Sequence, residues 1–135
     1  MRKIDKIIVH CSATPEGRDY TAKDIDSWHR ARGFNGIGYH WVVYRDGRVV
    51  KGRSELQAGA HCKGYNARSI GICYIGGVAS DGKTPKDTRT AAQREALQIL
   101  IKELLIKYPG ATIHGHNEFA AKACPSFDVK REFGS

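Results

Sequence analysis

The stretch Ile4-Asp5-Lys6-Ile7-Ile8-Val9-His10, close to the start of the chain, says most about the fold. Its apolar residues are all β-branched, a composition that is typical of buried β-strands. The run stops at His10, so a polar imidazole stands where the strand ends. We therefore expect a buried strand that carries His10 at its end.

Helix caps and a turn signal predict the elements that follow this strand. Thr21 and Thr90 stand three residues before Asp24 and Gln93, which is the spacing of N-terminal capping residues in helices. Asp46-Gly47 lies between two β-rich runs and is a strong hairpin signal. The expected elements are a helix over 21–33, a hairpin over 39–51, a strand over 69–76, a helix over 90–108 and a strand over 111–114, with loop in the remainder.

This order predicts an α/β fold, in which a single domain over residues 1–135 has a mixed central β-sheet flanked by helices. A chain of 135 residues is long enough to bury about two-thirds of its extended surface, so it needs no disulfides to fold. Hydrophobic residues make up 41% and charged residues 27% of the chain, which is ordinary for a globular protein.

The charge balance indicates the class of partner. A formal net charge of +8 favours polyanions, either nucleic acid or the anionic bacterial envelope. The basic residues are scattered and no nucleic-acid-binding motif is visible, which disfavours nucleic acid. Only Ile7-Ile8-Val9 follows the basic start, too short for a secretory signal or a membrane span. We expect a monomer that is made in the cytoplasm without a signal peptide and does not insert into a membrane.

The chain has four cysteines, at positions 11, 62, 73 and 124, and none forms a CxxC pair. A four-cysteine zinc site is therefore disfavoured, and without a secretory signal the thiols should be reduced. Cys73 sits in an apolar run and is expected in the core. We expect only Cys124 to have a chemical role.

His10, His116 and Cys124 form a candidate set of metal ligands. Two imidazoles and one thiolate leave a fourth position open, which is the pattern of a catalytic zinc rather than a structural one. His114 competes with His116, because alternation along a strand would put both on one face. Each candidate falls at or just past a strand end, so we expect the zinc site at one edge of the sheet.

Several blocks of sequence, taken together, resemble the phage-type N-acetylmuramoyl-L-alanine amidases, which are small zinc enzymes related to the peptidoglycan recognition proteins. The resemblance runs from about Ile4 to Lys130 without a large insertion. The blocks are Val9-His10-Cys11-Ser12-Ala13-Thr14, Gly38-Tyr39-His40, Ser69-Ile70-Gly71-Ile72, His116 and Lys122-Ala123-Cys124-Pro125-Ser126-Phe127-Asp128.

The resemblance implies a role for each residue that matches the family's motifs. One Zn²⁺ per chain would be held by His10, His116 and Cys124, with His116 preferred to His114 because it lies eight residues before the cysteine. The catalytic tyrosine and lysine of the family fall on Tyr39 and Lys122. His61 and Asn66 fall in the loop beside the substrate groove, where we expect them to contact the sugar or the stem peptide. Independently of the resemblance, alternation along a regular strand would point His40 away from Tyr39, so we expect His40 to be structural. Asn117 replaces a second histidine that the phage enzymes have after the middle ligand.

The function implied by the resemblance is hydrolysis of the amide bond between N-acetylmuramic acid and L-alanine in peptidoglycan. The enzyme would act on the cell wall after release or export from the cytoplasm. Two alternatives stay open. The first is a peptidoglycan-binding module without hydrolysis, and the second is an amidase that also binds and inhibits a phage RNA polymerase.

Overall fold

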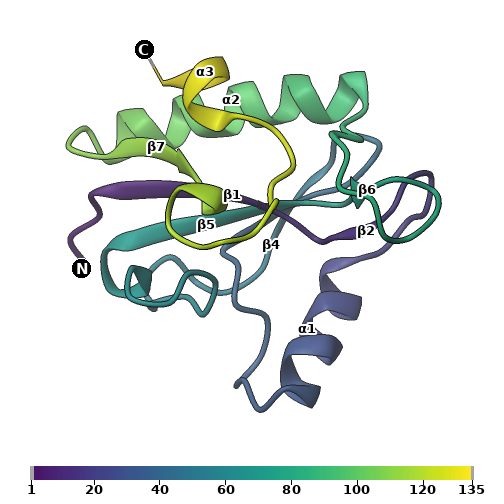
Figure 1. Ribbon diagram of the computed structural model, residues 1–135. Helices are drawn as coiled ribbons and strands as arrows, with labels where there is room; N and C mark the ends of the chain where they lie inside the picture. Colours follow the sequence, from purple (N-terminus) through teal and green to yellow (C-terminus); the bar gives the residue numbers. More distant parts are fainter. Residues whose placement is uncertain (1, 135) are drawn as a thin grey trace.

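The computed structural model describes residues 2–134, whose core is a five-stranded sheet (Figure 1). The elements, in chain order, are β1 (Lys6–Cys11), β2 (Thr14–Pro15), α1 (Ala22–Ala31), β3 (Trp41–Val43), β4 (Val49–Lys51), the 3-10 turn η1 (Asn66–Arg68), β5 (Ser69–Tyr74), β6 (Gly77–Val78), α2 (Ala91–Lys107), β7 (Thr112–Gly115), the 3-10 turn η2 (His116–Glu118) and α3 (Val129–Phe133). The strand order is β4-β3-β5-β1-β7, and only the β3–β4 pair is antiparallel. This is the predicted α/β fold with a mixed central sheet.

The strand β1 lies inside the sheet, between β5 and β7, and alternates between its two faces. Ile7, Val9 and Cys11 join the main apolar core, whereas Ile8 and His10 point to the opposite face, because successive side chains of a strand alternate. All five side chains are almost fully buried. A continuous apolar run is what a strand covered on both faces requires.

The helix α2 covers the face of Ile7 and Val9. Thr90 caps its start, with a side chain that accepts from the backbone N–H of Gln93 at 3.0 Å. The buried amide of Gln93 also donates to the carbonyls of Val43 and Ile75, which ties the helix start to the sheet. The apolar stripe of the helix is buried against the strands and consists of Leu97, Leu100, Ile101 and Leu104. Each such side chain contributes about 1.5–3 kcal/mol by leaving water.

The helix α1 lies on the other side of the sheet from α2 and α3 (Figure 1). Thr21 caps it, and the side chain of Asp24 closes the capping box. Ile25 anchors the helix to a second, smaller apolar cluster formed with Ile37, Val42, Cys73 and Ile75. This helix covers only part of its face of the sheet, and the side chain of His10 emerges on that face.

The C-terminal segment differs from its prediction. Residues after 114 were expected to be loop, but β7 continues to Gly115 and is followed by η2, and Val129–Phe133 form α3. The side chain of Asp128 caps α3 by accepting from the N–H of Arg131 at 3.0 Å, and Val129 is buried. A helix of five residues is too short to show the apolar periodicity by which helices are recognised.

None of the helices within residues 2–134 has the length and apolar character that a membrane span requires.

Candidate metal centre and cleft

The register of β1 and β7 brings two histidines together. The strands are parallel, and Val9 pairs with Gly115, so the next residue of each segment lies at the same end of this strand pair. The residue that follows Val9 is still part of β1, whereas the one that follows Gly115 begins η2. These residues are His10 and His116, and their ring centroids lie 4.5 Å apart. Neighbouring parallel strands thus place both imidazoles at one end of the sheet, next to its β7 edge.

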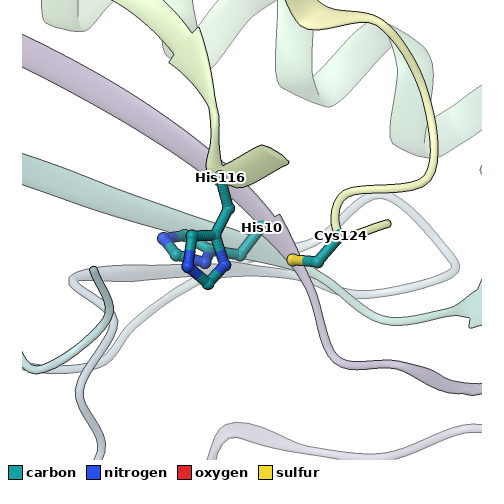
Figure 2. Close-up of side chains that lie close together, drawn as sticks. All are labelled: His10, His116 and Cys124. Atoms are coloured by element: carbon teal, nitrogen blue, oxygen red, sulfur yellow. The ribbon is translucent and has the colours of Figure 1, made fainter. Parts of the chain in front are cut away.

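Cys124 reaches the same point from the C-terminal loop. Its Sγ accepts a hydrogen bond from the backbone N–H of Cys11 at 3.1 Å. The loop is fixed on either side, because Tyr74 Oη donates to the carbonyl of Pro125 at 2.7 Å and Ser126 Oγ donates to that of Gly77 at 2.8 Å. Ligand atoms of His10, His116 and Cys124 all lie within 4.8 Å of one another, and Figure 2 shows the three side chains converging.

The structure places His116, and not His114, in this cluster. His114 lies within β7, where its Nε2 is 2.6 Å from Thr112 Oγ1 and its Nδ1 is 2.9 Å from a carboxylate oxygen of Glu118. The strand ends at Gly115, so the alternation that would have put both histidines on one face does not continue to His116.

Both histidines of the cluster favour the neutral form, which is the form that binds a metal ion. Burial lowers the pKa of His10 well below its usual value, and the charges of His61, His116 and Lys122 lower it further. Burial also lowers the pKa of His116, again with help from Lys122. The positive charge of Lys122 thus disfavours the protonated form of both rings.

A cleft of about 770 Å³ opens beside the cluster. Its lining includes all four residues for which the sequence predicted catalysis or substrate contact, which are Tyr39, His61, Asn66 and Lys122, together with His116. Three cationic side chains, those of Arg32, Lys63 and Lys122, also line the cleft, and none of the residues lining it is acidic. Such a lining favours a ligand that carries negative charge.

Tyr39 packs in the cleft between two histidines. Its ring centroid lies 5.0 Å from that of His10 and 5.4 Å from that of His29. Burial raises the pKa of Tyr39 well above its usual value, so the phenol keeps its proton at neutral pH. The Nδ1 of His29 accepts from the backbone N–H of Gly38 at 2.9 Å, which fixes the segment before Tyr39. No local pattern of residues reports this contact, because His29 lies in α1 and Gly38 lies beyond the end of that helix.

Comparison with known proteins identifies this arrangement. A family model described as N-acetylmuramoyl-L-alanine amidase matches residues 1–127. The chain belongs to the N-acetylmuramoyl-L-alanine amidase family. It is 46% identical to the endolysin of Escherichia phage T7 over 127 residues, which cover 94% of this chain and 83% of that protein.

Solved structures agree with this assignment. The amidase LysC from Clostridium intestinale superposes with a TM-score of 0.81 at 29% identity, over 97% of this chain and 82% of LysC. The Drosophila protein PGRP-LB superposes with a TM-score of 0.81 at 27% identity, over the full chain and 82% of PGRP-LB. Both catalytic amidases and peptidoglycan recognition proteins therefore share this fold.

Two further cleft residues of this amidase, Asn66 and His61, use side-chain polar atoms for contacts inside the protein. Asn66 Oδ1 accepts from the backbone N–H groups of His61 and Cys62, both at 2.9 Å. His61 is only 9% exposed, and its Nδ1 lies 2.8 Å from Nε2 of His10. Contact of either residue with substrate stays a prediction.

The expectation that His40 is structural is confirmed. Its side chain is fully buried. Nδ1 accepts from the backbone N–H of Gly71 at 3.0 Å, and Nε2 lies 2.8 Å from the carbonyl oxygen of Gln57. Both ring nitrogens are thus used by the scaffold of the amidase.

Proposed function

We propose that this amidase uses one zinc ion, held by His10, His116 and Cys124, to hydrolyse the bond between N-acetylmuramic acid and L-alanine of the stem peptide. The observation that carries the proposal is the cluster of these three ligand atoms within 4.8 Å. It lies at the wall of a cleft large enough to take a sugar and part of a peptide.

The donor set fits zinc better than the other common biological cations. Zinc binds imidazole nitrogen at about 2.0–2.1 Å and thiolate sulfur at about 2.3 Å, whereas magnesium and calcium prefer oxygen ligands. Tetrahedral bonds from one ion to two imidazole nitrogens and one thiolate sulfur set these ligand atoms about 3.3–3.6 Å apart. Shifts of less than about 1.5 Å in the side chains would therefore close the cluster around an ion. When bound by three protein ligands, zinc acts as a Lewis acid and lowers the pKa of water in its open position to about 7.

Lys122 has the charge that amide hydrolysis needs. Attack on the amide carbonyl develops negative charge on the carbonyl oxygen, and a nearby ammonium group stabilises it. Lys122 lines the same cleft as His116, which supports this role for its charge. We propose that Lys122 stabilises the oxyanion.

Tyr39 is the proposed proton carrier and orienting group. Its phenol keeps its proton at neutral pH and lies next to the ring of His10. A protonated phenol can donate a hydrogen bond to a reacting group and pass a proton toward the leaving amine of L-alanine. The amine must gain a proton before it leaves, so this role completes the reaction.

The presence of the full ligand set favours an enzyme over a module that only binds peptidoglycan. A binding surface needs neither a thiolate nor two neutral imidazoles around one point. Inhibition of a phage RNA polymerase and the monomeric state stay predictions of the sequence.

The test is to identify which bond is cut in purified peptidoglycan. We expect new amino groups on L-alanine without new reducing ends of the sugar, loss of this activity with a chelator, and its return with zinc. Release of reducing ends alone, or activity that a chelator does not change, would refute the proposal.

A further inference from the structure

The imidazole of His10 has one side-chain hydrogen-bond partner among residues 2–134, and that partner is His61. Nδ1 of His61 and Nε2 of His10 lie 2.8 Å apart, and the two rings meet edge to face at 89° with centroids 4.9 Å apart. Because Nε2 of His10 is engaged in this bond, Nδ1 is the nitrogen of His10 that is left for a metal ion.

We propose that His61 is a positioning residue for the metal site: it accepts the Nε2 proton of His10 and so holds that ring in the tautomer and orientation that offer Nδ1 to zinc. This inference rests on the proposed zinc site. It gives His61 a different role from the substrate contact expected from the sequence.

The direction of the hydrogen bonds follows from the chemistry of a neutral imidazole, which has one N–H and one bare nitrogen. If Nδ1 of His10 binds a metal, Nε2 must carry the proton and donate to Nδ1 of His61. His61 then carries its own proton on Nε2, which lies 3.2 Å from the buried Oγ of Ser69. The chain of donors thus runs from His10 through His61 to Ser69. The reverse direction would put the proton of His10 on Nδ1 and block the metal.

Gly59 and Gly71 leave a slot, free of side chains, that the His61 ring occupies. A Cβ on Gly71 would lie 2.7 Å from both Cγ and Cδ2 of His61, and a Cβ on Gly59 would lie 2.5 Å from Cδ2. Such contacts are too short for real atoms, so any side chain at either position would displace the imidazole. Gly71 is in the interior of β5, where glycine weakens a strand and often marks close approach of another group.

The backbone of His61 is also fixed. Asn66 Oδ1 accepts from the N–H groups of His61 and Cys62, so one side chain holds the loop at this point. The ring is therefore restrained by its backbone, by the slot and by a partner at each nitrogen. Partners that orient a metal-binding histidine are the usual second layer of a zinc site.

Three variants at one position test the inference. Asparagine carries an acceptor oxygen close to where Nδ1 of histidine lies, and glutamine carries its polar end closer to Nε2. We expect His61→Ala and His61→Gln to weaken zinc binding by about 10–100-fold in a chelator competition, the usual effect of losing such a partner. His61→Asn should recover most of that affinity. The thermal stability of the metal-free proteins, measured in parallel, separates loss of the ligand's orientation from loss of the fold.

The tautomers give a second readout that needs no variant. Imidazole nitrogen NMR of the zinc-loaded wild type should show the proton of His61 on Nε2. Zinc affinity equal to wild type in His61→Ala and His61→Gln, or a proton on Nδ1 of His61, would overturn the inference. Failure of the wild type to bind zinc in the same titration would instead refute the proposed function.

Discussion

The backbone N–H of Cys11 donates a hydrogen bond to Sγ of Cys124 at 3.1 Å, which joins the first strand to the C-terminal loop across 113 positions of sequence. Residue 10 is thereby held beside residue 124 by the protein's own contacts. Tyr74 and Ser126 fix the loop at two more points. The candidate metal centre is therefore built by the fold and does not require the ion for its assembly.

Loss of the thiolate should separate activity from folding. In Cys124→Ser we expect zinc affinity and hydrolysis to fall by orders of magnitude, because a neutral hydroxyl is a poor zinc ligand. Circular dichroism and the melting temperature of the metal-free protein should stay close to wild type. Cys73→Ser is not a suitable control, because Cys73 is buried in the core, so the comparison is with metal-free wild type. Full activity in Cys124→Ser would contradict the proposed centre.

The choice between two neighbouring histidines has its own test. His116→Ala should lose tight zinc binding, whereas His114→Ala should keep it, because His114 contacts Thr112 and Glu118 away from the cluster. Zinc titration of the two variants measures the difference. Loss of zinc in His114→Ala alone would show that the ligand assignment is wrong.

Removing the proposed oxyanion donor should leave the metal in place. Lys122→Ala is expected to bind zinc like wild type and to lower kcat by about 10²–10³-fold, the usual effect of losing one such donor. Lys130→Ala, which changes an exposed lysine in α3, is the matched control and should retain activity. If Lys122→Ala lost its zinc, the lysine would have a structural role at the centre.

The slot for His61 can be tested with a substitution that leaves every polar side-chain atom of the site in place. Gly71→Ala should displace the His61 ring and weaken zinc binding, since the added carbon would lie 2.7 Å from the ring. Gly110→Ala is the control, because nothing lies within 4 Å of a Cβ at that position. Equal zinc affinity for the two variants would mean that the slot does not position the ring.

A buried arginine should stabilise the segment that follows Cys124. Arg89 pairs with Asp87 at 2.9 Å and with Glu132 of α3 at 2.6 Å, and its guanidinium lies over the ring of Phe127. Its side chain is 1% exposed, whereas both carboxylates keep some contact with solvent. Arg89→Met should therefore lower the free energy of unfolding by about 3 kcal/mol, the low end for a broken buried pair. Urea denaturation measures this loss.

Arg94→Met is the matched control for Arg89→Met. Arg94 pairs with the same two carboxylates, but its side chain is 47% exposed. Exposed ion pairs contribute less than about 1 kcal/mol. A loss in Arg94→Met as large as in Arg89→Met would show that burial of Arg89 is not what matters.

The same ion pair predicts a pH dependence of stability. Burial alone would raise the pKa of Asp87, but the hydrogen bonds and charge of Arg89 outweigh it and lower that pKa below its usual value. A carboxyl with a lowered folded-state pKa adds stability above its unfolded pKa of about 3.9, and this stability is lost as pH falls through the folded value. Wild type should therefore lose more unfolding free energy than Arg89→Met between pH 6 and pH 3. An equal loss in both would contradict this role of Arg89.

The sequence predicted the elements whose signals are local. Capping pairs at Thr21 and Thr90 and the turn at Asp46-Gly47 act within a few residues, and each element formed where they indicated. The short helix α3 was missed because its cap and one buried valine leave no periodic pattern. The strands β2 and β6 were also missed, because a pair of two-residue strands is too short to show an alternating pattern.

The site was predictable only where the motifs of a family applied. Spacing alone left His114 and His116 equivalent, and the end of β7 at Gly115 is what separates them in the structure. The contact of His61 with His10 spans 51 positions, and the slot that seats His61 depends on glycines from two different segments. Such contacts depend on the packed sheet, so no local pattern of residues reports them.

X-ray absorption at the zinc edge of the purified, zinc-loaded protein tests the central claim most directly. We expect one zinc per chain with a single sulfur neighbour at about 2.3 Å and three nitrogen or oxygen neighbours at about 2.0–2.1 Å. A spectrum without sulfur, or with more than one sulfur, would contradict a centre built from His10, His116 and Cys124.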